Sequence, residues 1–156
     1  MREDKIQNMT LLTWTLQVWS DYRRGQRLDG HLASIAYSLD FHKEWWNDWN
    51  TAKEGTDDPS ITTRLIHIHN DAAIKTQIEM GQSQAVKAFY DALVQKGFTE
   101  FESIHTLGIA LAEENAYARA HSETFDQERF VARADRYVKE ALSRPNLTRL
   151  AKAKAY

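Results

Sequence analysis

A Glu-x-x-His pattern, formed by Glu102 and His105, is the clearest arrangement in this sequence that could hold a metal ion. Residues three apart on a helix occupy neighbouring positions, so the carboxylate and the imidazole can converge on one ion. Carboxylate-bridged dimetal bundles carry this motif twice, together with further glutamates. The chain carries the motif once, which favours a single ion over a dimetal centre.

A second pair of candidate ligands, His67 and Asp71, lies one helical turn apart in an earlier segment. If that segment faces the helix of Glu102 and His105, two imidazoles and two carboxylates meet, a ligand set that suits Zn, Fe or Mn. Glu113, two turns after His105, is a further ligand or an outer acceptor that orients one. The predicted metal ligands are therefore His67, Asp71, Glu102, His105 and Glu113.

A purely structural interpretation of these residues remains open. Glu102 also completes a capping box with Thr99, and His105 is also explained as a core histidine bonded to Asn115 or to a carbonyl. His67 and Asp71 are also explained as a hydrogen-bonded pair. The other histidines near predicted helix ends are interpreted as solvated caps or dipole partners. These are His31, His42 and His121.

Nucleophilic catalysis has no support in the sequence. The chain has no cysteine, no Gly-x-Ser-x-Gly turn and no glycine-rich phosphate loop. Acid–base chemistry by His67 or His105 with a carboxylate is compatible with the pattern, but nothing names a substrate. No catalytic residue is assigned.

The elements that must position these residues are helices, because long segments lack glycine and proline and no strand pattern survives. The predicted start signals are Asp29, Asp58 before Pro59, Ser83, and the capping boxes Thr99–Glu102 and Thr124–Gln127. The fold class is therefore all-α, a single-domain bundle of six or seven helices. The predicted helices cover about 4–23, 29–39, 40–49, 59–80, 83–96, 99–121 and 124–144.

Apolar residues at spacings of three and four predict the buried faces of these helices. The core is predicted to contain Trp19, Leu65, Ile68, Ile104 and Leu111. The faces are also predicted to include Trp14 in the first helix, and Phe41, Trp45 and Trp49 together in the third. The cluster of Trp45, Trp46 and Trp49 is interpreted either as a ligand or partner platform or as a corner of the core that anchors a short helix.

Composition places the chain among globular proteins. It has 156 residues with 42% hydrophobic and 27% charged residues, and no apolar run or apolar N-terminal segment suggests a membrane span or a signal. The absence of cysteine fits a reducing cytoplasm, which is the predicted location.

Charge is uneven along the chain although the net charge is −2. Residues 129–156 carry eight Lys or Arg against Asp135 and Glu140. This basic end is interpreted as a solvated helix that pairs with the acidic remainder. Its aromatic residues Phe130 and Tyr137 are assigned to the buried face of the last helix, which argues against a nucleic-acid partner.

Three stretches resemble an uncharacterised family of small bacterial proteins, catalogued as a domain of unknown function. The first contains an aromatic helix followed by the pair His42 and Glu44, within WTLQVWSDYRRGQRLDGHLASIAYSLDFHKEWW. The second is RLIHIHNDAAIKTQIE, in which Asp71 stands where that family tends to have a second histidine, and the third is FESIHTLGIALAEENAY with Glu113. The resemblance implies a bacterial origin and an all-helical fold, but no activity.

Two functions follow as hypotheses. One is a non-catalytic binding or interaction protein, with an unknown protein partner or self-association. The other is a metal-binding protein or metal-dependent enzyme with one divalent ion, Zn, Fe or Mn, between two helices. The domain is predicted to span 1–145, followed by a basic tail, 146–156.

Overall fold

All regular structure in the described residues is helical. The computed structural model describes residues 2–53 and 58–144, with side chains from residue 11 onward, and these contain seven α-helices and one short 3-10 helix. The predicted all-α fold of six or seven helices is confirmed. No helix in these ranges is both long enough and apolar enough to cross a membrane.

The chain divides into two compact units, Met1–Ala72 and Ala73–Tyr156. The boundary falls within one continuous helix, α4 (Pro59–Glu79). A single domain over 1–145 stays a prediction, and the predicted tail, 146–156, lies outside the described residues.

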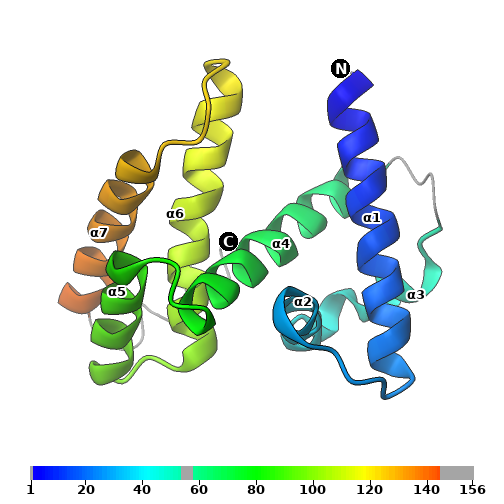
Figure 1. The fold of residues 1–156 in the computed structure, drawn as a ribbon, viewed down its shortest axis with the longest axis horizontal. Coiled ribbons are helices and arrows are strands. Elements are labelled where there is room, and N and C mark those ends of the chain that lie inside the picture. The colour runs from blue at the N-terminus through cyan, green and yellow to red at the C-terminus, as the bar shows by residue number, and fades with distance from the viewer. Residues whose placement is uncertain (1, 54–57, 145–156) are drawn as a thin grey trace. The chain divides into compact units, whose positions relative to one another are not determined.

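The first unit contains α1 (Arg2–Arg23), α2 (Gly30–Phe41), the 3-10 helix η1 (Lys43–Trp45), α3 (Trp46–Thr51) and the first part of α4 (Figure 1). Three residues predicted for its core, Trp19, Leu65 and Ile68, are at most 4% exposed. Burial of such side chains supplies most of the stability of a domain of this size. The remaining buried apolar residues of this core are Leu12, Val18, Ile35, Ala36, Leu39, Trp49, Ile61 and Ala72.

The tryptophan cluster forms a corner of this core. Trp49 is buried, and the indole N–H of Trp46 donates to the carbonyl of Leu39 at 2.9 Å. The Trp46 ring also lies 5.4 Å from the ring of Trp19, centroid to centroid. The structural interpretation of this cluster is therefore confirmed.

Two aromatic residues predicted for buried faces are instead exposed. Trp14 is 39% exposed and Phe41 is 46% exposed. Phe41 belongs to the last turn of α2 rather than to the helix of Trp49, so the predicted common face does not form. That prediction was wrong because α2 continues past its expected end at Leu39.

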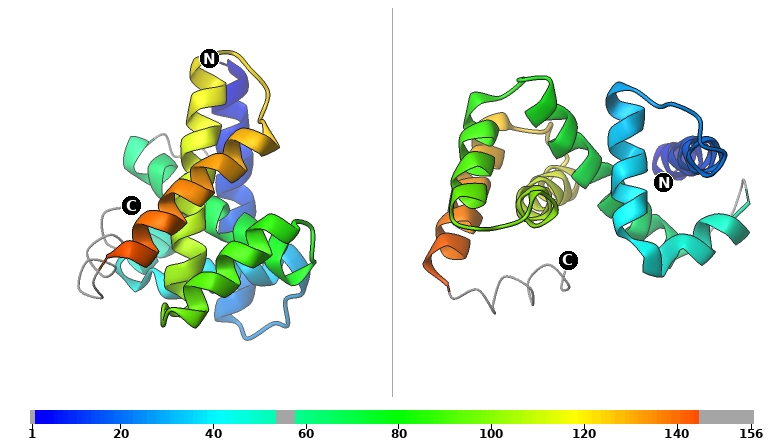
Figure 2. Two further views of the ribbon diagram at one scale, coloured as in Figure 1. Left: turned by 90° about the vertical axis from the view of Figure 1, so that its left-hand side faces the viewer. Right: turned by 90° about the horizontal axis from the view of Figure 1, so that it is seen from below.

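The second unit contains α5 (Gln84–Gln95), α6 (Glu100–Ala120) and α7 (Gln127–Ser143), which lie side by side (Figure 2). The predicted core residues Ile104 and Leu111 are 2% and 6% exposed, which confirms the predicted buried stripe of α6. Phe130, on α7, is fully buried in this unit.

Local sequence signals set most helix starts. The Thr99 hydroxyl accepts from the backbone N–H of Glu102, and the Glu102 carboxylate accepts from the backbone N–H of Thr99, so the predicted capping box is confirmed. Gly97, between α5 and α6, has a φ of 105°, a conformation that side-chain-bearing residues rarely adopt. The predicted box at Thr124 is wrong: α7 begins after Asp126, whose carboxylate accepts from the backbone N–H of Arg129.

Candidate metal centre

Two of the predicted ligands, His67 and Asp71, meet on α4. They stand four residues apart on one face of the helix, and the Nε2 of His67 lies 3.2 Å from the Oδ2 of Asp71. Both residues are buried, at 6% and 2% exposure. A buried carboxylate needs a cation or hydrogen-bond donors, since leaving its charge uncompensated is costly.

A third residue, His42, joins this pair from the end of α2. The Nε2 of His42 lies 3.8 Å from the Oδ2 of Asp71. One ligand atom from each of His42, His67 and Asp71 lies within 4.8 Å of the other two. The interpretation of His42 as a solvated cap was wrong, because its side chain at the end of α2 is turned against α4 and is only 6% exposed.

The separations suit one bound transition-metal ion. Protein nitrogen and oxygen ligands lie about 2.0–2.2 Å from zinc, so two such ligands in a tetrahedral arrangement are about 3.4 Å apart. The observed separations to Asp71, 3.2 Å and 3.8 Å, bracket that value. Two imidazoles and one carboxylate are ligand types that Zn, Fe and Mn accept.

The opposite edge of the His42 ring faces a carboxylate. The Nδ1 of His42 lies 3.1 Å from the Oε1 of Glu44, whose side chain is 60% exposed. Partial burial raises the pKa of Glu44, but hydrogen bonds from its own backbone N–H and from His42 outweigh burial and lower that pKa. The carboxylate is therefore held in its charged, accepting form.

One indole, that of Trp45, packs against both histidines. The ring of Trp45 stacks on His42 with centroids 4.4 Å apart and an interplanar angle of 14°. The same indole meets the His67 ring edge-on, with centroids 5.0 Å apart. The guanidinium of Arg64 lies over the Trp45 ring. Contact with this indole restricts how the two imidazoles can rotate, which favours a fixed binding geometry.

His69 has an environment separate from that of His67 and Asp71. Its Nε2 lies 2.8 Å from the hydroxyl of Thr15, which itself donates to the carbonyl of Leu11, so the imidazole N–H donates to Thr15. Burial, helped by the charge of His31, lowers the pKa of His69 to about 4. His69 is thus a neutral structural residue and not part of the His42, His67 and Asp71 cluster.

The other predicted ligands belong to the second unit. Glu102 caps α6, as the structural interpretation expected. His105 is 1% exposed, and its ring lies 5.5 Å from that of Phe101. A ligand set that joins these residues to His67 and Asp71 stays a prediction.

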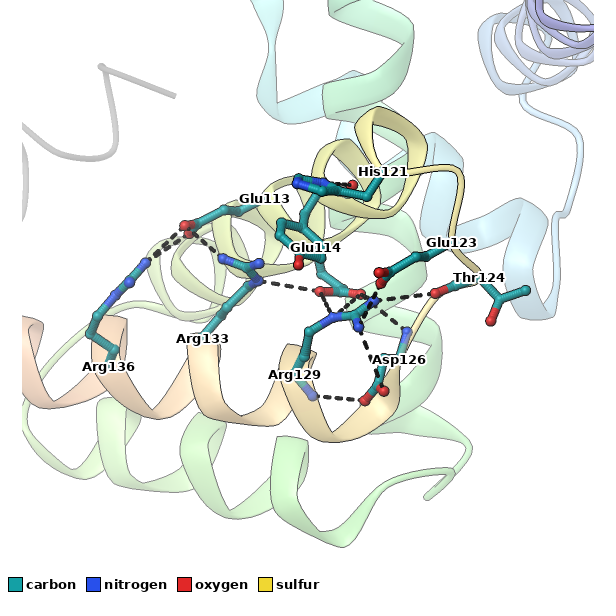
Figure 3. A network of polar contacts seen from close by, with 10 residues as sticks. Glu113, Glu114, His121, Glu123, Thr124, Asp126, Arg129, Arg133 and Arg136 are labelled. Carbon is teal, nitrogen blue, oxygen red and sulfur yellow. Dashed lines mark hydrogen bonds and ion pairs between the residues drawn. The ribbon is translucent and has the colours of Figure 1, made fainter.

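Glu113 lies in a network of charges between α6 and α7 (Figure 3). Its carboxylate accepts from Arg133 at 2.9 Å and from Arg136 at 2.9 Å. This pairing agrees with the interpretation that the basic end of the chain neutralises acidic residues. The role of Glu113 as a metal ligand stays a prediction.

The neighbouring Glu114 is the buried member of the network. Its side chain is 0% exposed and accepts from Arg129, Arg133 and the backbone N–H of Asp126. Hydrogen bonds from Arg129 lower the pKa of Glu114 to about 2, against the opposing effect of burial. Arg129 and Arg133 also lie over the ring of Tyr117, at 4.8 Å and 5.1 Å. The network therefore fixes α7 on α6.

Comparisons with known proteins identify no relative. No protein-family model, curated protein or solved structure matches the chain. The geometry of the His42, His67 and Asp71 cluster is therefore the observation that bears on function.

Proposed function

We propose that this protein binds one divalent transition-metal ion, with His42, His67 and Asp71 as ligands. The observation that carries the proposal is the convergence of three buried ligand atoms to within 4.8 Å of one another. They come from the residue that follows α2 and from α4, so the arrangement depends on the fold and not on a local sequence motif alone.

The charges around the cluster support a cation. Carboxylates flank the His42 ring on both sides, Glu44 at Nδ1 and Asp71 near Nε2. A carboxylate only accepts, so a neutral imidazole that donates from Nδ1 to Glu44 presents a lone pair at Nε2 toward Asp71. The contact between this lone pair and the Asp71 carboxylate is unfavourable. A metal ion between them replaces the contact with two favourable bonds, whereas a purely structural role requires a proton on Nε2.

Elemental analysis of protein purified without a histidine tag tests the proposal. We expect about one Zn, Fe or Mn per chain, and we expect chelator-stripped protein to take up one equivalent in a calorimetric titration. His42→Ala and Asp71→Asn should each weaken binding by more than about 100-fold, because even the loss of an outer partner costs 10–100-fold.

His121→Ala is the matched control. His121 caps the end of α6, is exposed and stacks on Tyr117, so its loss should leave the affinity unchanged. A wild-type protein that takes up no stoichiometric ion would refute the proposal. So would equal affinities in the wild type and His42→Ala.

The remaining predictions from the sequence stand beside this proposal. A protein partner or self-association, the cytoplasmic location and the family resemblance rest on sequence patterns and stay predictions. The metal hypothesis takes precedence because the convergence of His42, His67 and Asp71 supports it.

A further inference from the structure

The turn after α2 places a carboxylate directly behind the proposed ligand His42. The carbonyl of His42 accepts from the backbone N–H of Trp45 at 2.9 Å, which closes the 3-10 turn η1. Glu44, inside this turn, is thereby brought beside the ring and meets its Nδ1 at 3.1 Å. The same turn stacks the Trp45 indole on the face of the ring.

We infer that Glu44 is a positioning residue for the metal centre, which sets the tautomer and orientation of His42; the inference rests on the proposed metal site. Glu44 lies within hydrogen-bond distance of Nδ1, whereas Asp71, at 3.8 Å from Nε2, lies beyond it, so the proton of a neutral His42 is held at Nδ1. The Nε2 lone pair is then directed at the point shared with His67 and Asp71. A carboxylate behind a ligating histidine also makes the imidazole a stronger ligand.

Exposure distinguishes this role from a contribution to the core. The side chain of Glu44 is 60% exposed, whereas the side chain of His42 is 7% exposed. Loss of an exposed carboxylate on a one-turn helix removes little packing, so an effect of Glu44 on metal binding would act through His42.

Two measurements test the inference. The first is the metal affinity of chelator-stripped protein, titrated with zinc alone: Glu44→Ala should weaken it by about 10–100-fold, and Glu44→Gln, which keeps a carbonyl acceptor, should recover part of that loss. The second is the ¹⁵N NMR spectrum of the His42 imidazole in metal-free protein, recorded at a pH high enough for this ring to be neutral. It should show the proton at Nδ1 in the wild type and a mixture of tautomers in Glu44→Ala.

Asp21→Ala is the matched control. It removes one carboxylate from the same unit, and that carboxylate pairs with Arg24 and accepts from Gln17. It should change neither measurement, and circular dichroism should show unchanged helix content in all variants. The inference would be overturned if Glu44→Ala had the same zinc affinity and the same His42 tautomer as the wild type. That result would not contradict the proposed metal site. A wild type that binds no zinc, manganese or ferrous iron would overturn both.

Discussion

The buried carboxylate of Glu114 should be the most sensitive polar group of the second unit. Glu114→Gln keeps the shape of the side chain but removes its charge, and places an amide donor where Arg129, Arg133 and the Asp126 backbone all donate. Breaking a buried ion pair costs about 3–5 kcal/mol. We expect Glu114→Gln to lower the free energy of unfolding by about 3 kcal/mol, the lower end of this range. The side chains of Arg129 and Arg133 are 33% and 18% exposed, so water can solvate them.

Glu113→Gln is the matched control, an identical change one residue away. The Glu113 side chain is 33% exposed and pairs with Arg133 and Arg136 at the surface, where an ion pair is worth about 0.2–1 kcal/mol. The difference between the losses of unfolding free energy in the two variants therefore reports the effect of burial, since the substitution is chemically the same.

Urea unfolding, followed by far-UV circular dichroism and by tryptophan fluorescence, measures both variants. All five tryptophans lie in the first unit, so fluorescence reports that unit, whereas circular dichroism reports helices in both. Glu114→Gln should shift the dichroism transition to lower urea while the fluorescence transition moves less. Equal shifts for Glu114→Gln and Glu113→Gln would refute the reasoning.

Acid should remove the difference between the wild type and Glu114→Gln. The pKa of Glu114 is lowered from an ordinary 4.5 to about 2, first by hydrogen bonds from Arg129, so the unfolded chain takes up this proton more readily than the folded one. The stabilisation is complete above pH 4.5 and is lost as the pH falls toward 2. A difference that stays constant over this range would show that Glu114 does not act through its charge.

Three further predictions concern α6 and the ligand His105 that the sequence predicts on it. Leu111→Ala should lower the free energy of unfolding by about 2–5 kcal/mol in urea titrations, because Leu111 is buried; Val94→Ala, at an exposed site on α5, should change it by less than about 0.5 kcal/mol. Thr99→Ala should cost about 1 kcal/mol in thermal unfolding, whereas Thr124→Ala should cost almost nothing because Asp126 is the cap. The sequence-based ligand set predicts that His105→Ala abolishes metal binding and leaves helix content nearly intact. A site made by His42, His67 and Asp71 instead predicts unchanged metal content, which would remove His105 from the sequence-based set.

Local signals made the helices predictable. The Asp58-Pro59 start is observed in α4, where Asp58 accepts from the backbone N–H of Ser60. Ser83 caps α5 in the same way by accepting from Val86. Such caps depend on residues within one turn, so sequence alone is sufficient to find them.

The start of α7 shows where local signals fail. Thr124 and Gln127 fit the capping pattern, but the helix begins after Asp126. The backbone N–H of Asp126 donates to Glu114, twelve residues earlier on α6, which fixes this residue at the helix end. A tertiary contact therefore chose between two acceptable caps.

In the candidate site, too, one part follows from local sequence spacing and another part depends on tertiary contacts. The sequence alone determined that His67 and Asp71 share one face of a helix, because a spacing of four is a local property of helices. It did not determine that His42 joins them, since that depends on how the end of α2 meets α4. The His42-x-Glu44 pattern was the available signal, but a histidine at a helix end is solvated or buried according to what packs over it. Only the tertiary structure decided that His42 is buried against Asp71, and so where three candidate metal ligands meet.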